Sequence, residues 1–245
     1  MVRLILKRNN LRLRDVEGLY QSLLKRGISI RNVRYVHFVL HCSLGDAVRY
    51  GMIGQNPAHG AKQPRLPQTE IRILDQDEVT QFLICVMGNR NEALYHLAVK
   101  TGMRIGELFE LMGFDLEWNS GYLRILRQAQ RVPSEGIKFV DPKTRAGKRT
   151  IPLGRTMLQI LSEHKRKQQL EKAVAGDKWK ENNLVFPSSI GTPQSESNFL
   201  KIFKALLQKA GLPIIRFHNL RQTAASIMLN NGRNFIEVSK MLGHS

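Results

Sequence analysis

The sequence Phe-His-Asn-Leu-Arg at positions 217–221 and the later Leu-Gly-His-Ser at positions 242–245 are the most informative stretches of the chain. His218 and Arg221 are three residues apart near the start of a predicted helix, so both side chains lie on one side of it. The positive end of a helix attracts an anion. The pattern therefore predicts an anion site to which His244 adds a donor, although a single histidine at either place is also common as a structural residue.

A second candidate for the same site lies upstream, where positions 101–108 read Thr-Gly-Met-Arg-Ile-Gly-Glu-Leu. Arg104 opens a predicted helix, and Glu107 follows three residues later on the same side. The planar guanidinium of an arginine can bind two oxygens of one phosphate. A surface ion pair between Arg104 and Glu107 is the simpler explanation of this segment taken alone.

A basic hairpin tip is predicted at positions 141–149, which read Asp-Pro-Lys-Thr-Arg-Ala-Gly-Lys-Arg. A lysine on such a tip can enter a groove and deliver a proton to a leaving oxygen. Lys143 is the first choice for this role. Lys138 and Lys148 compete with it, because the sequence does not determine which side chain points inward. Simple attraction to phosphate explains all three lysines equally well.

The overall charge also favours a phosphate-bearing partner. The chain of 245 residues carries 38 Lys and Arg against 20 Asp and Glu, a formal charge of +18 with an isoelectric point near 10.4. Such a balance indicates nucleic acid binding, by a sequence-directed DNA binder or by a ribosome-associated or merely basic protein. The hydrophobic content of 42% is sufficient for one large or two modest domains. No apolar run is long enough for a signal peptide or a membrane span, so we expect a cytoplasmic, nucleoid-associated protein.

The two cysteines do not indicate a metal site. Cys42 and Cys85 are far apart in the sequence, with no Cys-x-x-Cys pair and no histidine cluster beside them. We expect both to be reduced residues of the core, and we predict neither a metal nor a cofactor.

Residues 1–60 are predicted to form a helical domain. Ser29 is a suitable N-cap for a helix whose apolar residues recur every three or four positions, at Val33, Val36, Leu40, Leu44 and Val48. The opposite flank carries the basic side chains of Arg31, Arg34, His37 and Arg49. This flank is either an ordinary solvated face or a surface that contacts DNA.

Residues 61–70 are predicted to be a basic linker. Prolines 57, 64 and 67 interrupt helix formation around this segment, and Lys62 and Arg65 add positive charge. The linker either touches phosphates or serves as a solvated tether. Residues 71–245 form the second predicted domain, which begins with a capping box of Asp75 and Glu78.

The second domain is predicted to be helical with a small antiparallel β-sheet. Strands are expected at 122–126 and in two pieces within 137–153. Helices are expected at 94–112, 157–175, 197–210 and 218–230. The fold class is therefore mainly α with a small antiparallel β-sheet.

The four motifs, in this order, resemble the tyrosine recombinase family of phage-type site-specific integrases. They are similar to the family's first arginine box, its hairpin lysine, its His-x-x-Arg segment and its Leu-Gly-His segment. Residues 30–35 and 53–58 also resemble the helical core-binding domain of integrases. The resemblance therefore implies a helical core-type DNA-binding domain followed by an α+β catalytic domain.

The resemblance implies a site-specific recombinase that binds double-stranded DNA and exchanges strands through a 3′-phosphotyrosine intermediate, without metal or cofactor. Arg104 and Arg221 would clamp the nonbridging phosphate oxygens, stabilising the charge of the transition state. Lys143 would be the general acid, His218 would assist proton transfer, and His244 would donate a hydrogen bond to the phosphate. Glu107 would brace Arg104.

The chain departs from the family pattern at its nucleophile. In the family a tyrosine follows Leu-Gly-His by about ten residues, whereas the five tyrosines here lie at positions 20, 35, 50, 95 and 122. We therefore expect a truncated chain that binds DNA without cleaving it, with a catalytic domain incomplete at its C-terminus and a first domain incomplete at its N-terminus. It should be a monomer in solution, with a tetramer on DNA reserved for the full-length form.

Two alternatives remain at this level. The chain is either part of an integrase that recombines DNA in its complete form, or a naturally short remnant that works only as a DNA-binding module. An unrelated basic helical protein that binds RNA is the third possibility.

Overall fold

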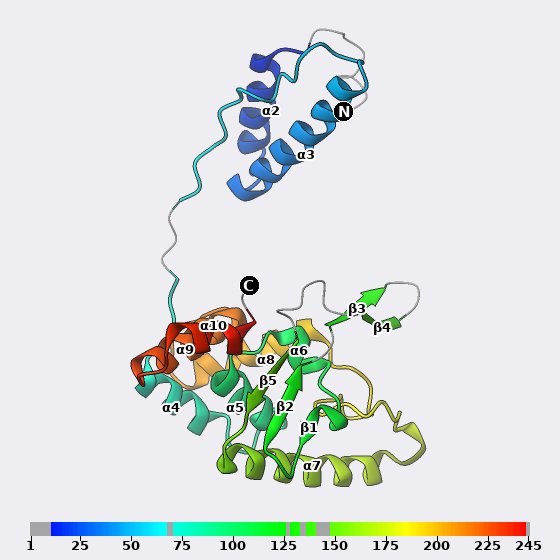
Figure 1. The fold of residues 1–245 in the computed structure, drawn as a ribbon, viewed down its shortest axis with the longest axis vertical. Coiled ribbons are helices and arrows are strands. Elements are labelled where there is room, and N and C mark those ends of the chain that lie inside the picture. The colour runs from blue at the N-terminus through cyan, green and yellow to red at the C-terminus, as the bar shows by residue number, and fades with distance from the viewer. Residues whose placement is uncertain (1–10, 68–70, 126–127, 133–135, 141–147, 244–245) are drawn as a thin grey trace. The chain divides into compact units, whose positions relative to one another are not determined.

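The computed structural model describes residues 11–67, 71–125, 128–132, 136–140 and 148–243 (Figure 1). Contacts between residues divide the chain into two compact units, Met1–Glu70 and Ile71–Ser245, which we call the N-terminal unit and the C-terminal unit. Within the described part of the chain, none of the helices combines the length and apolar character that crossing a membrane requires.

The N-terminal unit is built on two packed helices, α2 (Leu13–Lys25) and α3 (Ile30–Arg49). The predicted N-cap is confirmed, since Ser29 Oγ accepts a hydrogen bond from the Asn32 amide over 3.3 Å. The small core consists of buried residues from both helices and the following loop, with Leu40 and Leu44 packed against it: Val16, Tyr20, Val33 and Ala58. The apolar stripe predicted for α3 is therefore confirmed at Val33, Leu40 and Leu44.

The chain after α3 returns to the two helices before it leaves the N-terminal unit. Asn56 Nδ2 donates to the carbonyl of His41 over 2.9 Å, and the Lys62 amide donates to Glu17 Oε1 over 2.9 Å. Arg34 Nη1 donates to the carbonyl of Pro64 over 3.4 Å. The first part of the segment predicted as a linker, residues 61–70, is thus attached to the helices as far as position 64.

The C-terminal unit contains a three-stranded antiparallel sheet in the order β1-β2-β5: Leu116–Glu117, Tyr122–Ile125 and Arg149–Pro152. Strands β3 (Gln128–Val132) and β4 (Gly136–Val140) form a separate antiparallel pair. The strands expected at 122–126 and within 137–153 are confirmed. Strands β1 and β3 were not predicted, because β1 has only two residues and β3 lacks an alternating apolar pattern.

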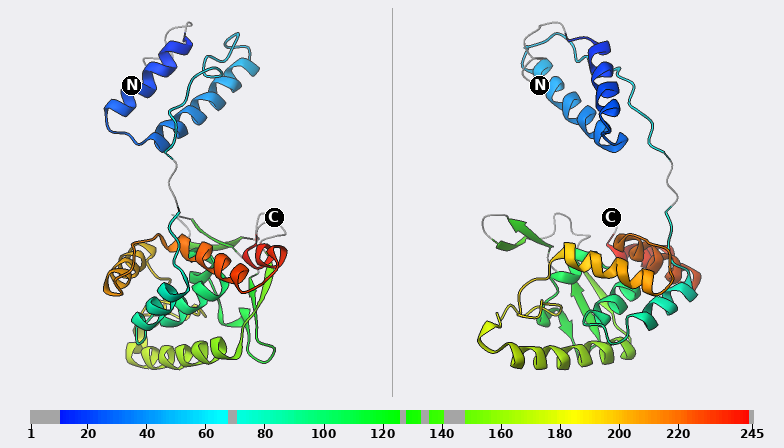
Figure 2. Two further views of the ribbon diagram at one scale, coloured as in Figure 1. Left: turned by 90° about the vertical axis from the view of Figure 1, so that its left-hand side faces the viewer. Right: turned by 180° about the vertical axis from the view of Figure 1, so that it is seen from behind.

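Helices make up most of the C-terminal unit, which confirms the prediction of a mainly α fold with a small antiparallel sheet. The α-helices are α4 (Gln76–Cys85), α5 (Glu92–Thr101), α6 (Ile105–Phe109), α7 (Arg155–Ala175), α8 (Glu196–Lys209), α9 (Phe217–Asn230) and α10 (Phe235–Leu242), and the short 3-10 helices are η1 (Gly113–Asp115) and η3 (Gly176–Lys178). Helix α5 packs against α4, α7 and α9, so it occupies the centre of the unit. Figures 1 and 2 show α7 on one side of the C-terminal unit and α9 with α10 on the other.

Local signals in the C-terminal unit behave as expected. The predicted capping box is confirmed, because Asp75 Oδ1 accepts from the Glu78 amide over 2.8 Å and Glu78 Oε2 accepts from the Asp75 amide over 3.0 Å. The core under α8 is aromatic, with Tyr95 stacked on Phe199 at 5.3 Å between ring centroids. This core fixes the central helix α5, whose C-terminal end leads directly into the Arg104 segment.

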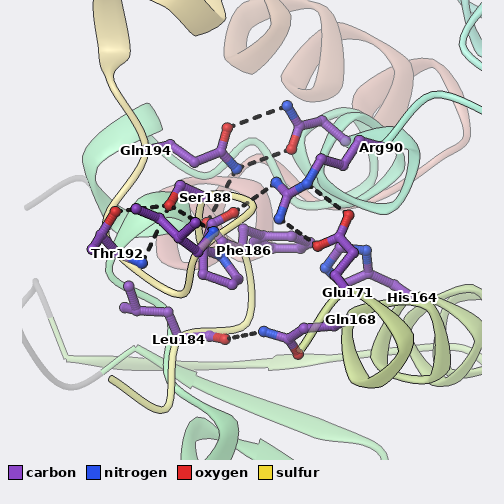
Figure 3. A network of polar contacts seen from close by, with 12 residues as sticks. Arg90, His164, Gln168, Glu171, Leu184, Phe186, Ser188, Thr192 and Gln194 are labelled. Atoms are coloured by element: carbon purple, nitrogen blue, oxygen red, sulfur yellow. Dashed lines mark hydrogen bonds and ion pairs between the residues drawn. The ribbon is translucent and has the colours of Figure 1, made fainter. Parts of the chain in front are cut away.

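A polar network anchors the loop that precedes α8 (Figure 3). Arg90 donates two hydrogen bonds to the Glu171 carboxylate over 2.8 and 2.7 Å and one to the carbonyl of Pro187 over 2.7 Å. Gln168 Nε2 donates to the carbonyl of Leu184 over 2.9 Å. The network therefore joins α7, the turn before α5 and the loop before α8.

The prediction for the cysteines is wrong for one of them. Cys42 is exposed on α3, because it lies on the face of the helix turned away from Val33 and Leu40. Cys85 is partly buried, and its Sγ donates to the carbonyl of Leu206 over 3.7 Å.

Candidate functional site

Arg221 lies buried in the second turn of α9, with 5% of its surface exposed. Its Nη1 donates to the carbonyl of Gly102 over 2.9 Å, and its Nη2 donates to the carbonyl of Leu242. Burial and the nearby charge of Arg104 lower the pKa of Arg221 to about 10, while Glu107 opposes this shift. Arg221 therefore remains a cation at neutral pH and joins α9 to the ends of α5 and α10.

Gly102 makes this meeting of three helices possible. It ends α5 in the left-handed conformation, with φ of +64°. A Cβ at this position would lie 2.5 Å from Leu242 Cδ2 and 3.4 Å from Ala224 Cβ. Only glycine combines this backbone conformation with so close an approach. Gly102 in the Thr-Gly segment before Arg104 thus ends α5 and also allows Leu242 to pack closely against it.

Glu107 is the acidic centre of the site. Its carboxylate accepts hydrogen bonds from the Arg104 amide over 2.9 Å and from Arg104 Nη1 over 3.0 Å. It also accepts from Arg149 Nη1 over 3.0 Å and from Arg149 Nη2 over 2.7 Å. Burial favours a higher pKa of Glu107, but the hydrogen bonds and charges of Arg149 and Arg104 outweigh it and lower the pKa below its usual range. Glu107 is therefore ionised. The expected contact with Arg104 is present, but the carboxylate is buried rather than on the surface.

Arg149 was not predicted as a member of the site. It begins β5, and its side chain is only 6% exposed. Besides the two bonds to Glu107, its Nε donates to the carbonyl of Met241 over 2.7 Å. One signal in the sequence was available: Arg149 and Ile151 are two residues apart in a strand, so they share the face that points to the core.

Arg104 is the member of this group that reaches solvent, with 40% of its side chain exposed. One edge of its guanidinium is held by Glu107, and a planar guanidinium carries five N–H groups. The three arginines at 104, 149 and 221 against the single carboxylate of Glu107 leave two positive charges. The arrangement can therefore bind an anion in front of Arg104, with the buried charges behind it.

The other residues predicted for the site are only partly covered by the structure. His218 is exposed in the first turn of α9, and within the described residues no hydrogen bond or ion pair joins it to Arg104 or Arg221. Lys148 is exposed next to Arg149. Lys143 and His244 lie outside the described residues. The described backbone nevertheless ends at Gly243, directly after the carbonyl that Arg221 holds.

Four of the basic residues predicted for DNA contact lie on the surface of the N-terminal unit to different degrees. Arg31, Lys62 and Arg65 are exposed, and Arg34 is half-buried against Pro64.

The assignment of His37 to a DNA-contacting flank is wrong. His37 is buried, and its Nδ1 shares a hydrogen bond with the Tyr20 hydroxyl over 2.7 Å. The physical reason is helical periodicity, since His37 follows Val33 by four residues and therefore lies on the same apolar face. Burial lowers the pKa of His37, and the charges of His41 and Arg34 lower it further.

Metal ligands are not gathered anywhere in the described ranges, where no three side chains of His, Cys, Asp or Glu are arranged to hold an ion. The described site consists of guanidinium groups, one carboxylate and backbone carbonyls.

Comparison with known proteins identifies the family to which the chain is similar. The model of the phage integrase family matches residues 72–245. A XerC-like tyrosine recombinase from Caldanaerobacter subterraneus subsp. tengcongensis is 31% identical over 94% of this chain and 63% of its own length. An integrase from Saccharopolyspora erythraea is 25% identical over 94% of this chain and 64% of its own length. The chain thus spans just under two thirds of the length of these relatives.

Solved structures show the same fold. The Tn1549 transposon integrase in complex with a circular intermediate DNA superimposes with a TM-score of 0.82 at 19% identity, covering 99% of this chain and 83% of the other. A lambda integrase tetramer bound to a Holliday junction gives a TM-score of 0.68 at 19% identity, covering 97% and 65%. The fold is that of the tyrosine recombinases. The chain belongs to the phage integrase family, as the resemblance of its motifs predicted.

Proposed function

We propose that this chain is the duplex-binding and phosphate-clamping part of a site-specific tyrosine recombinase, with residues 1–60 and 71–245 as its two DNA-contacting domains and 61–70 as the linker between them. The complete form would break and rejoin DNA strands through a 3′-phosphotyrosine intermediate, and it would assemble as a tetramer on DNA from chains that are monomeric in solution. Family membership and the formal charge of +18 support this proposal.

The observation that carries the proposal is the group of three arginines around Glu107. Arg104 and Arg221 are brought together from segments more than 100 residues apart, and only Arg104 extends into solvent. Positive groups fixed before the reaction stabilise charge that develops on a phosphate, because they need no rearrangement in the transition state. In this role Arg104 binds the nonbridging oxygens directly, and the buried Arg221 adds its positive charge from behind Arg104.

The remaining roles follow from the positions of the motifs in the sequence. Lys143 is proposed as the general acid to the leaving 5′ oxygen, and His218 as its partner in proton transfer. His244 is proposed as a hydrogen-bond donor to the phosphate. Support for His244 comes from the end of α10, where Arg221 holds the carbonyl of Leu242, two residues before His244 in the sequence.

Duplex binding is tested by fluorescence polarisation with a labelled DNA of about 30 base pairs at several salt concentrations. Arg31→Ala should lower the affinity about threefold and reduce the salt dependence by about one counterion. Arg104→Ala should weaken ground-state binding by a similar or smaller factor, because its larger role is in the transition state. Arg166→Ala is the matched control, since it removes one arginine of an exposed ion pair on α7, across the unit from α9 and α10.

The proposal requires that the chain bind duplex DNA more tightly than RNA. Tighter binding to structured RNA than to duplex DNA at the same salt would instead indicate an RNA-binding protein. Equal losses for Arg31→Ala and Arg166→Ala would mean that binding depends on total charge alone.

A second candidate function is a DNA-binding module without cleavage. All five tyrosines of the 245 residues lie at or before position 122. Tyr95 is fully buried, and Tyr20 is engaged with His37, so neither hydroxyl reaches solvent. We propose that the 245-residue polypeptide binds a nicked duplex without forming a covalent adduct. Denaturing gel electrophoresis tests this, and a covalent band that maps to one of the five tyrosines would refute it.

A further inference from the structure

The last carbonyls of α10 are held by two buried guanidinium groups. Carbonyls at the end of a helix have no partner within the helix. Arg149 Nε donates to the carbonyl of Met241 over 2.7 Å, and Arg221 Nη2 donates to the carbonyl of Leu242. Gly243 then turns the chain in the left-handed conformation, with φ of +71°. The direction in which the chain leaves α10 is therefore fixed by arginines from β5 and α9.

The same guanidinium of Arg149 also holds the opposite side of the site. Its two terminal nitrogens bind both oxygens of Glu107, over 3.0 and 2.7 Å. Glu107 in turn binds the backbone amide and the Nη1 of Arg104. A continuous series of hydrogen bonds therefore runs from Met241 through Arg149 and Glu107 to Arg104, and every link between the two ends is buried.

We propose that Arg149 is a positioning residue of the phosphate site, which sets both the orientation of Arg104 and the direction in which the chain leaves α10 at Gly243. This inference rests on the proposed function, because it assigns Arg149 to the machinery that presents Arg104 to a DNA phosphate. Arg149 itself stays behind the site and acts through Glu107 and through the carbonyl of Met241.

Only an arginine satisfies all three acceptors at once. Its donors point in fixed directions in one plane, so one edge binds the Glu107 carboxylate while Nε is directed at Met241. A lysine carries a single ammonium group, which can neutralise Glu107 without reaching the carbonyl of Met241 as well. Arg149→Lys therefore separates the charge of this residue from its geometry.

The charge of Arg149 also determines whether Arg104 is bound by Glu107 alone or stays available to an anion in solvent. In the wild-type chain Glu107 is neutralised mainly by the bidentate pair with Arg149, which leaves Arg104 with 40% of its side chain in solvent. Without Arg149, the buried carboxylate would depend on Arg104 alone and would draw it inward. Arg149 thus keeps Arg104 available for an anion.

The first test is amide hydrogen exchange of the full 245-residue chain, followed by mass spectrometry of the peptide that covers α10. Arg149→Lys should accelerate exchange in the last turn of α10 about tenfold, the change expected from loss of one charge-assisted hydrogen bond. The double variant Arg149→Met with Glu107→Gln removes both charges of this buried pair together. This double variant should be more stable globally than Arg149→Met alone. Its α10 should still exchange fast, because the carbonyl of Met241 still lacks its donor.

Arg124→Lys is the matched control. Arg124 lies on the neighbouring strand β2, is half exposed and forms an ion pair with Glu117, so its replacement should leave α10 exchange unchanged. The proposal would be overturned if α10 exchanged as slowly in Arg149→Lys as it does in the wild-type chain. Rescue of α10 protection in the double variant would also overturn it, since Arg149 would then act only through overall stability.

The second test uses duplex affinity in a double-mutant cycle. Arg149→Lys should weaken binding about threefold in the wild-type background and should have no further effect in the Arg104→Ala background. Equal losses in both backgrounds would show that Arg149 does not act through Arg104. Absence of duplex binding by the wild-type chain would contradict the proposed function, while the exchange experiment would still decide whether Arg149 positions α10.

Discussion

The two units of the chain differ in how deeply their selected arginines are buried. In the N-terminal unit, Arg31 is exposed on a helix pair whose core contains few fully buried residues. In the C-terminal unit, Arg149 and Arg221 are buried beside a far larger core and are fixed by hydrogen bonds. Exposed arginines adapt to a DNA backbone at little cost in folding energy. Buried arginines require compensation, but they define positions within the site.

The largest effect in this comparison is expected for Glu107→Ala, because it leaves the buried Arg149 without its partner. Loss of one member of a buried pair costs about 3–5 kcal/mol, so the C-terminal unit should be severely destabilised. Urea unfolding followed by tryptophan fluorescence measures this unit alone, since both tryptophans, 118 and 179, belong to it. Asp46→Ala is the control in the N-terminal unit, where the pair with Arg49 is exposed and the change should be small.

The next largest effect is expected for Gly102→Ala. The new methyl group would collide with Leu242 and would occupy a backbone conformation that alanine disfavours. We expect a loss of about 3 kcal/mol from the combined overpacking and backbone strain. Gly27→Ala is the matched variant in the N-terminal unit, with φ of +78° and open space around the added Cβ. It should cost about 1 kcal/mol, from backbone strain alone. Equal losses would mean that the approach of Leu242 is not tight.

The smallest effect concerns pH and the N-terminal unit. The pKa of His37 is lowered in the folded state by burial and by the charges of His41 and Arg34. The unfolded chain therefore binds a proton that the folded unit excludes, and stability falls as the pH decreases below the ordinary histidine pKa of about 6.5. Thermal melts followed by circular dichroism between pH 7.5 and 5 should show this loss in the transition of the N-terminal unit.

His37→Gln keeps a hydrogen-bonding side chain beside Tyr20 and removes the titrating group. It should flatten the pH dependence of the N-terminal unit. An acid-induced loss of the same size in this variant would assign the effect to groups other than His37.

Local signals in the sequence predicted the parts of the fold that depend on neighbouring residues. The capping box at Asp75 and the apolar stripe through Val33 and Leu40 are patterns within one or two helical turns. The four motifs likewise predicted the family. His37 was assigned to the wrong face, although its spacing of four from Val33 indicated the core.

The contacts of the site itself were less accessible to sequence reasoning. Arg149 and the carbonyl of Met241 are 92 residues apart, and Arg221 and Gly102 are 119 residues apart. Nothing within either segment specifies the partner, because each guanidinium binds a backbone carbonyl, which every residue carries. The contact of Arg104 with Glu107 was predicted because the two residues are one helical turn apart.

Because a ribosome synthesises the chain from its N-terminus, contacts between residues far apart in the sequence can form only late in synthesis. The helices of the N-terminal unit are complete by residue 49, and their contacts with the following segment by residue 64. The site requires the carbonyls of Met241 and Leu242, and a growing chain lengthens by only about 5–20 residues each second. The N-terminal unit can therefore fold many seconds before Arg104 and Arg221 acquire their final neighbours, and a nascent chain carries its exposed basic surface well before the proposed anion site is formed.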